Sequence, residues 1–405
     1  MIKEVKAMNI TKANGKNEYE LIENLKKRSG ETDEKIVEAV TTIINSVKEQ
    51  GDEAVREFTA RFDGIVPRKT VIEKDELNSY LDCVDEDFKN AIIKAKNNIY
   101  DFHLRQAQQS WMTTKENGVI MGQRIRGLHR VGIYVPGGTA AYPSSVLMNA
   151  IPAKIAGVKE IIMVTPPGKD GNPNPDIMAA AAVAGVDRVF LVGGAQAVAA
   201  LAFGTEKIPK VDKIVGPGNI FVATAKKLLY GVVDIDMIAG PSEILIVADK
   251  SAKASFLAAD LMSQAEHDVR ASAILLTTSA ELARATAREI DRQIKYLERQ
   301  EIIEKSLNDY GEIIVCENLD QAIDFANELA PEHLEMCVEE PLNISAGLIM
   351  QAVYFSATSR LNRSAIILQA QTMFFRQAVL PDFFLHSLLT VLLRKVHSFI
   401  ILKMN

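Results

Sequence analysis

The stretch RVGIYVPGGTAAYPSSVLMNAIPAKIAGVKEIIMVTPP, residues 130–167, decides the fold of this chain. Its outer parts, VGIYVPGG and EIIMVTPP, are short β-rich runs that end in glycine or proline. Between them lies a longer apolar run, SSVLMNAIPAKIAG, which predicts a helix packed on a sheet. A strand, a helix and a second strand in this order are typical of a βαβ unit with parallel strands.

The same alternation continues along the chain. RVFLVGG and KIVGPG predict two further buried strands, and PDIMAAAAVAG and AQAVAALAFG predict helices. A second series follows, with strands at EILIVAD, ASAILLTT and EIIVC, a helix ending in LMSQAEHD, a long charged helix from Ala280 to Arg299, and LDQAIDFANELAPEHLEM. The sequence therefore predicts an α/β fold with two parallel-sheet units.

The first hundred or so residues are predicted to be helical. Apolar residues recur at helical spacing from Ile36 to Val47. Thr32 can cap this helix, with acidic residues in its first turn, and Gly51 can end it.

Composition excludes several classes of protein. The formal net charge of −6 argues against nucleic-acid binding. Three scattered cysteines are too few for a disulfide framework and indicate thiols in a reducing cytoplasm. The N-terminus lacks the apolar core of a secretory signal, and FFLHSLLTVLL is too short to span a membrane. We therefore expect a cytoplasmic protein without nucleic-acid or membrane partners.

Residues 344–405 differ in composition from the rest of the chain. They hold one of its 52 acidic residues, Asp382, one of its 23 glycines, and six of its 15 phenylalanines. A charge-balanced domain does not normally change so abruptly. The loss of acids and glycines together predicts an aberrant tail produced by a change of reading frame.

The stretch LMSQAEHD, residues 261–268, ends an apolar helix with groups that could bind a metal. Gln264 and His267 stand three apart, so on a helix they would share a face. Zinc accepts imidazole nitrogen readily, but a glutamine oxygen is an unusual ligand. From spacing alone, a polar helix end with a satisfied histidine is the commoner explanation.

APEHLEM places Glu332 beside His333. An imidazole suits general base catalysis near neutral pH, and a neighbouring carboxylate could activate water. On a helix the two side chains would point about 100° apart, so they could face one pocket from adjacent angles. The alternative is a solvated helix start after Pro331.

Three glycine-containing turns follow predicted strands: YVPGGTA, VGGAQA and VGPGNI. Backbone N–H groups at such turns, each opening a helix, can hold a phosphate. The dinucleotide motif G-x-G-x-x-G and the P-loop are both missing. Each turn alone could be an empty strand end, but ligands gather at the carboxyl ends of parallel strands. In GPSE, Ser242 could contact substrate or bond its own turn.

Taken together and in order, these stretches resemble the histidinol dehydrogenases. The resemblance covers roughly residues 20–343. It implies a zinc- and NAD-dependent enzyme of histidine biosynthesis that oxidises L-histidinol to L-histidine through bound L-histidinal. It also implies a homodimer with one Zn²⁺ per active site.

The resemblance implies a role for each matched residue. Gln264 and His267 would bind zinc, and Glu332 and His333 would carry out acid–base catalysis. Ser242 would contact substrate, together with Gln264, His267 and His333. Three further residues would line the NAD site: Tyr134, Gln196 and Asn219.

The implied fold is two incomplete Rossmann-like domains, one inserted in the other, with an N-terminal helical dimerising segment at residues 1–26. The first domain would comprise residues 27–133 and 242–343 and hold the metal and catalytic residues. The second, residues 134–241, would hold NAD. Residues 344–405 would be the aberrant tail.

The tail departs from the family pattern. The family's remaining zinc ligands, an aspartate and a histidine near the C-terminus, have no counterpart here, so no role passes to Asp382, His386 or His397. Catalytic zinc normally has three protein ligands. The alternative is therefore a catalytically impaired or inactive relative that still dimerises or binds nucleotide. A zinc hydrolase that uses Glu332 to activate water is a third, weaker hypothesis.

Overall fold

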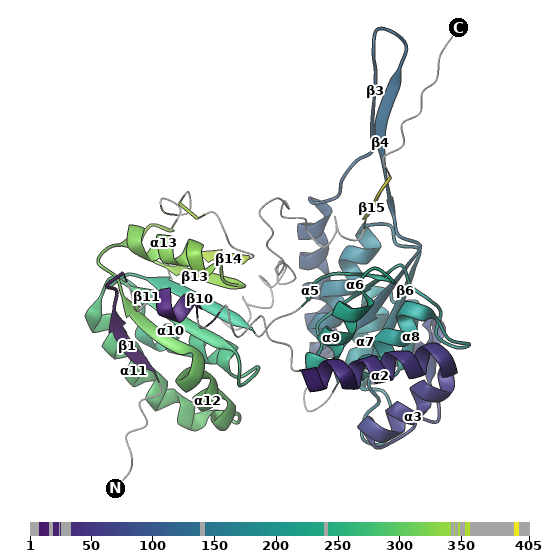
Figure 1. Cartoon of the computed structure of the whole chain (residues 1–405), viewed down its shortest axis with the longest axis horizontal. Coiled ribbons are helices and arrows are strands. Elements are labelled where there is room, and N and C mark those ends of the chain that lie inside the picture. Colours follow the sequence, from purple (N-terminus) through teal and green to yellow (C-terminus); the bar gives the residue numbers. More distant parts are fainter. Residues whose placement is uncertain are drawn as a thin grey trace. The chain divides into compact units, whose positions relative to one another are not determined.

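The computed structural model describes residues 8–15, 19–23, 25, 34–137, 142–238, 242–341, 344, 347 and 348, and the backbone of 353–356 and 393–396. The chain divides into two compact units (Figure 1). Unit 1 comprises residues 1–31 and 240–366, and unit 2 comprises residues 32–239 and 367–405. Residues 32–239 of unit 2 thus interrupt unit 1 in sequence, and the prediction of two parallel-sheet units, one inserted in the other, is confirmed for this part of the chain.

Unit 2 is built on a six-stranded sheet in the order β2-β7-β6-β5-β8-β9. Its strands are β2 (Val71–Glu73), β5 (Arg130–Tyr134), β6 (Glu160–Thr165), β7 (Arg188–Leu191), β8 (Lys213–Val215) and β9 (Asp234–Ile235). Only β2, at the edge, runs antiparallel to its neighbour. The remaining strands carry nearly continuous apolar runs because helices cover both faces.

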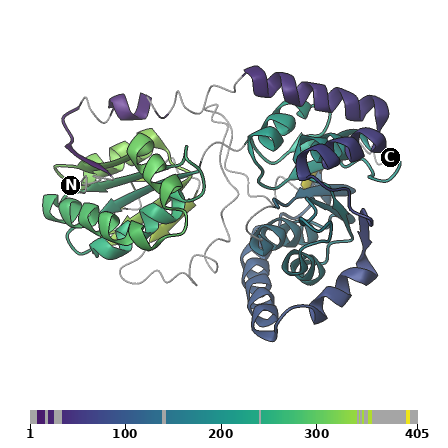
Figure 2. The same cartoon turned by 90° about the horizontal axis from the view of Figure 1, so that it is seen from below.

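Helices pack against the two faces of this sheet (Figure 2). One face is covered by α2 (Glu34–Gln50), α3 (Asp52–Asp63), α8 (Gly194–Phe203) and α9 (Ile220–Leu229). The other is covered by α4 (Lys74–Ser79), α5 (Glu86–Leu104), α6 (Pro143–Ile155) and α7 (Pro175–Ala184). In β6, Ile161 and Met163 face the second group, whereas Ile162 and Val164 face the first.

The helices before residue 130 lie in unit 2, whereas the sequence analysis expected residues 27–133 to join 242–343. Val40 and Val47 of α2 are fully buried in the cluster that also contains Ile162. Burial of this apolar face on the unit 2 sheet decides where the segment packs. The predicted helix itself is confirmed, and Thr32, its expected cap, lies outside the described residues.

Unit 1 is built on a second six-stranded sheet, ordered β1-β12-β11-β10-β13-β14, in which every pairing is parallel. Its strands are β1 (Asn9–Lys12), β10 (Glu243–Ala248), β11 (Ser272–Thr277), β12 (Gly311–Val315), β13 (His333–Cys337) and β14 (Val353–Ser356). The N-terminal segment, expected to be helical, thus contributes an edge strand at residues 9–12 and a helical turn over residues 19–23.

The helices of unit 1 also lie on both faces of their sheet. One face carries α10 (Ala254–Ala265), α11 (Ala280–Gln293) and α12 (Gln300–Tyr310), and the other carries α13 (Leu319–Leu329). The expected helix from Ala280 to Arg299 was too long, because the chain tightens into a 3₁₀ turn at Ile294–Tyr296. None of the helices in the described part of the chain combines the length and hydrophobicity that crossing a membrane requires.

A β-hairpin, β3 (Trp111–Thr114) and β4 (Ile120–Gly127), stands out from unit 2 (Figure 1). The strand β15 (Leu393–Val396) pairs with β4 in antiparallel register. All four residues of β3 are exposed.

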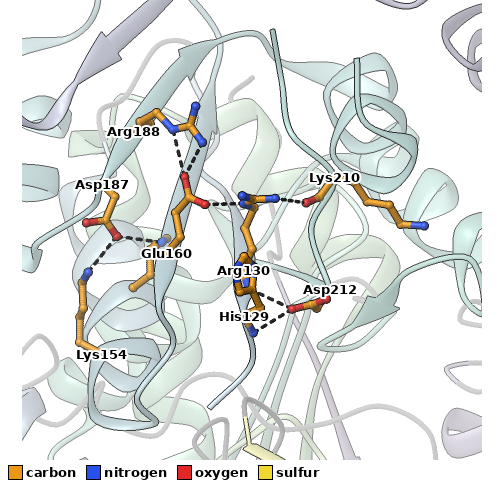
Figure 3. A network of polar contacts seen from close by, with 9 residues as sticks. His129, Arg130, Lys154, Glu160, Asp187, Arg188, Lys210 and Asp212 are labelled. Atoms are coloured by element: carbon orange, nitrogen blue, oxygen red, sulfur yellow. Dashed lines mark hydrogen bonds and ion pairs between the residues drawn. The ribbon is translucent and has the colours of Figure 1, made fainter. Parts of the chain in front are cut away.

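Charged side chains close the amino edge of the unit 2 sheet (Figure 3). The Glu160 carboxylate accepts from Arg130 Nε at 2.5 Å and from Arg188 Nε at 3.1 Å. Asp187 accepts from Lys154 Nζ at 3.0 Å and from the Ile161 backbone N–H at 2.9 Å. Each of these carboxylates is therefore balanced by a cation, and the pKa of both is lowered from the usual value, although partial burial opposes the shift.

Candidate functional site

The three glycine turns converge at the carboxyl edge of the unit 2 sheet. The hydroxyl of Tyr134, the last residue of β5, accepts a hydrogen bond from the Gly194 backbone N–H at 3.0 Å. Gly216, which follows β8, has φ +111°, and a Cβ placed there would lie 2.1 Å from Tyr134 O. Only glycine allows this approach. The turns expected to line one nucleotide site therefore lie together.

Polar groups with different roles surround these turns. Burial raises the pKa of Tyr134 to about 12, which keeps its phenol neutral. Gln196, in the first turn of α8, is buried, and its Oε1 has no hydrogen-bond partner in the described structure. Asn219 caps α9 by accepting from the Phe221 and Val222 backbone N–H groups at 3.1 Å. The amino ends of α8 and α9 thus lie at this edge, where they favour an anionic group.

A buried ion pair that the sequence analysis missed holds the Gly216 turn. Lys226 Nζ donates to Gly216 O at 3.0 Å, and Asp236 Oδ2 accepts from the Gly216 N–H at 2.7 Å. Lys226 and Asp236 also pair with each other, and both side chains are buried. The signal available in the sequence was a lysine on the otherwise apolar face of a predicted helix.

The second cluster lies at the amino edge of the unit 1 sheet. α10 returns between the parallel strands β10 and β11, so its C-terminal end lies where the strands begin. Gln264 occupies the last turn of α10 and is buried. His267 lies in the turn after the helix, and its backbone N–H donates to Gln264 O at 3.2 Å. The expected pair is therefore close in space, although only Gln264 belongs to the helix.

His333 is the first residue of β13, and its side chain faces α10. Its Nδ1 lies 2.9 Å from Glu243 O and 3.2 Å from Gln264 Nε2. A carbonyl only accepts, so the shorter contact assigns the hydrogen to Nδ1; the Gln264 amide can turn to suit. Nε2 then carries a lone pair, and this buried atom has no partner in the described structure. Burial lowers the pKa of His333, so the ring is a neutral base.

Glu332 precedes His333 and is not the solvated helix start that the sequence left open. Ala330, with φ 51°, ends α13, and the chain enters β13 after Pro331. The Glu332 side chain is 27% exposed, and its partial burial raises its pKa to about 7, against a backbone hydrogen bond at Glu243 that favours the anion. Its Oε2 lies 3.7 Å from His333 Nδ1. A carboxyl group that titrates near neutrality thus adjoins a neutral imidazole.

His267 is held as a neutral donor at this edge. The His267 side chain is exposed, yet the protein around it lowers its pKa by desolvation; Glu266 opposes the shift, and Arg299 and His333 add to it. The ring is therefore held in its neutral form, which is the form that binds metal. The carboxyl end of α10 contributes the negative end of its dipole. Gln264 and His267 thus supply two suitable donor side chains at the negative end of a helix dipole, with the positive charge of Arg299 acting against a cation.

Comparisons with known proteins agree with this geometry. The family model described as histidinol dehydrogenase matches residues 26–355. The chain belongs to the histidinol dehydrogenase family. It is 55% identical over 319 residues to a histidinol dehydrogenase from Clostridium acetobutylicum, covering 79% of this chain and 74% of the relative. It is 54% identical over 325 residues to that of Lactococcus lactis, covering 80% and 75%.

A solved structure supports the fold. The crystal structure of histidinol dehydrogenase from Elizabethkingia anophelis superimposes with a TM-score of 0.83 at 34% identity. The match covers 91% of this chain and 84% of that one. Both α/β units therefore belong to the histidinol dehydrogenase fold.

Ser242, the remaining residue assigned from the histidinol dehydrogenase pattern, directly precedes β10. Its side chain is half-buried, and its backbone O accepts from the Ser272 N–H at 2.9 Å. It therefore lies on the same sheet edge as Glu243 and His333.

Two carboxyl groups below this edge, the buried Glu335 and the half-buried Asp260, were missed. Glu335, on the same face of β13 as His333, has its pKa raised to about 8 by burial and then by Asp260. Asp260, one turn before Gln264 on α10, has its pKa raised to about 6 by burial. The residues lie 75 positions apart, so only the packing of α10 on β13 brings them together.

Most of the expected tail, residues 344–405, lies outside the described residues. The exceptions are Ile344, Gly347, Leu348 and the backbone of β14 and β15. The histidinol dehydrogenase match extends to residue 355, past the expected boundary. Asp382, His386 and His397 are not described, apart from their place in the sequence. Within the described part, no group of three or more His, Cys, Asp or Glu side chains is arranged to hold a metal.

Proposed function

We propose that this chain catalyses the NAD-dependent, four-electron oxidation of L-histidinol to L-histidine through bound L-histidinal, and is thus an oxidoreductase of histidine biosynthesis. The observation that carries the proposal is the bare, buried Nε2 of His333 beside Glu332, whose pKa is about 7. One group is set to remove an alcohol proton and the other to activate water. Family membership supports the choice of substrate.

His333 acts as general base in the first oxidation. Its Nε2 takes the hydroxyl proton of histidinol, while Nδ1 donates to Glu243 O at 2.9 Å. That bond fixes the tautomer and stabilises the imidazolium that forms. NAD, when bound, accepts the hydride that leaves the substrate carbon in each oxidation.

Glu332 acts in the step that adds oxygen. As the carboxylate, it takes a proton from the water that attacks the aldehyde carbon. With a pKa of about 7, it is strong enough as a base and still partly ionised at neutral pH. Its base form is lost as the pH falls below about 7, so this step should slow on acidification.

The donor atoms of Gln264 and His267 are suitable ligands for a Zn²⁺ ion. The amide oxygen and the neutral imidazole are both acceptable ligands, and the pKa of His267 is lowered, which favours the neutral ring. When bound, zinc would orient the imidazole and amine of histidinol. We assign substrate contact to Ser242 as well. His267→Asn should weaken zinc retention on dialysis; unchanged metal content would leave the pair as an ordinary polar helix end.

Tyr134, Gln196 and Asn219 are proposed to line the NAD site. Their support is the convergence of the three turns and the two helix amino ends, which suit a pyrophosphate. We therefore propose residues 134–241 as the NAD-binding part and residues 242–343 as the metal and catalytic part. A homodimer and a cytoplasmic location belong to the same proposal.

The test is turnover of the purified full chain with L-histidinol, NAD and Zn²⁺. The proposal predicts two NADH for each histidine formed. Retained NAD binding without NADH formation would identify the chain as an inactive relative. NADH and histidine in equal amounts would contradict the two-step oxidation.

A further inference from the structure

Four buried side-chain oxygen atoms in the described part of unit 2 have no hydrogen-bond partner: Asn149 Oδ1, inside α6, and Gln196 Oε1, Thr165 Oγ1 and Asp63 Oδ2. Buried polar atoms are normally paired, so each is a position where a ligand or an ordered water is expected. Thr165 ends β6, and Gln196 lies one turn into α8, so both belong to the carboxyl edge described above. Asp63 comes from a different part of the chain and had no assigned role.

Asp63 is brought toward this edge by the end of α3. The helix ends at Gly64, whose φ of 72° turns the chain. The next residues pack against the loop after β6, since a Cβ at Gly171 would lie 3.1 Å from Ile65 Cδ1 and 3.7 Å from Pro67 Cα. The Asp63 charge also acts on the Tyr134 phenol, whose pKa it helps to raise. Asp63 therefore lies near the turns assigned to NAD.

The chemistry of the orphaned oxygen restricts its partner. An ionised carboxylate only accepts hydrogen bonds, so the partner must be a donor such as a sugar hydroxyl. A phosphate offers no donor and would be repelled. Burial raises the pKa of Asp63, as expected for a carboxylate that lacks donors, and a bound hydroxyl would stabilise its charged form.

We propose that Asp63 binds a ribose hydroxyl of the dinucleotide and selects NAD over NADP. In ordinary Rossmann domains an acidic residue after the second strand has this role. Here the carboxylate would come from the end of α3, ahead of the first parallel strand in sequence. This inference rests on the proposed NAD-dependent function and adds a specificity-determining residue to it.

The experiment is calorimetric titration of NAD and of NADP into the full-length wild type and into Asp63→Asn. Hydrogen bonds to charged groups contribute about 1.5–3 kcal/mol, so Asp63→Asn should bind NAD roughly ten- to a hundredfold more weakly. NADP binding should be little changed or stronger, because the repelling charge is gone. In steady-state turnover, KM for NAD should rise while KM for histidinol stays the same.

Glu57→Gln is the matched control, because it removes one exposed negative charge from the same helix. It should bind NAD as the wild type does. Thermal unfolding checks that Asp63→Asn folds, and Asp63→Ser provides a second variant that should show the same loss. Wild-type NAD affinity in both Asp63 variants would overturn this inference alone, whereas a wild-type chain that binds no NAD would overturn the proposed function too.

Discussion

The two sheets have nearly the same strand order, but the residues proposed to be functional lie at opposite edges of the two sheets. In unit 2 the chain runs β5, β6, β7 outward and then places β8 on the other side of β5; in unit 1, β10, β11, β12 and β13 repeat this path. The unit 2 residues lie at the carboxyl edge, beside helix amino ends. The unit 1 residues lie at the amino edge, beside the carboxyl end of α10. One topology thus provides an anion-favouring edge and a cation-favouring edge.

The units also differ in how they treat buried charge. In unit 2 the buried Lys226 pairs with Asp236, and Glu160 lies between two arginines. In unit 1, Glu332, Glu335 and Asp260 have raised pKa values because burial disfavours their anions. These unit 2 groups are each balanced by an opposite charge, whereas the three unit 1 carboxyl groups titrate near neutral pH. Unit 1 is the place to expect proton transfer.

The largest effect should come from His333→Asn. Loss of a general base lowers kcat by about 10²–10⁴-fold. Zinc content should remain unchanged, because the assigned ligands are Gln264 and His267. Steady-state NADH formation and metal analysis make the measurement, and His129→Asn, at an exposed histidine of unit 2, is the control. A variant that loses zinc and recovers its rate with added metal would refute the role of His333 as a base.

Glu335→Gln should stabilise the protein at alkaline pH. The pKa of Glu335 is about 8 in the folded protein and 4.5 in an ordinary glutamate. The folded state therefore binds this proton more tightly, and the resulting stabilisation is complete below about pH 4.5 and is lost as the pH rises through 8. Glutamine carries no titrating proton. The free energy of unfolding of the variant, relative to that of the wild type, should therefore increase by about 2–4 kcal/mol from pH 5 to pH 9. Calorimetric unfolding tests this, with exposed Glu339→Gln as the control; a pH-independent difference would contradict it.

Glu160→Gln should have a smaller effect with the opposite dependence on pH. Its folded-state pKa lies below 4.5, so its contribution to stability is present above that value and is lost as the pH falls. The side chain is 23% exposed, so the loss at pH 7 should be about 1 kcal/mol. The same calorimetry makes the measurement. An equal loss at pH 3 would show that packing, and not charge, accounts for it.

Much of the fold follows from the sequence because strands buried on both faces are continuous apolar runs. The three glycine turns could also be placed together, since parallel strands end at one edge. HLEMC was misassigned because it follows α13 directly and mixes polar residues with Leu334 and Met336. Its strand places His333 and Glu335 on one face and the apolar residues on the other. The rule that ligands bind at the carboxyl ends of parallel strands could not locate the unit 1 site, which lies at the amino ends. The Asp260–Glu335 pair could not be predicted either, because it depends on tertiary packing.

The central claim is that NAD binding belongs to the unit 2 edge and proton and metal chemistry to the unit 1 edge. The most direct measurement is a calorimetric titration of NAD into the His267→Asn/His333→Asn double variant of the full chain. The account predicts that the double variant binds NAD with a Kd within about threefold of wild type, a difference in binding free energy of less than ~0.7 kcal/mol. None of the groups assigned to NAD is changed in this variant. A loss of NAD affinity of tenfold or more in the folded double variant would contradict the division of roles between the two sheets.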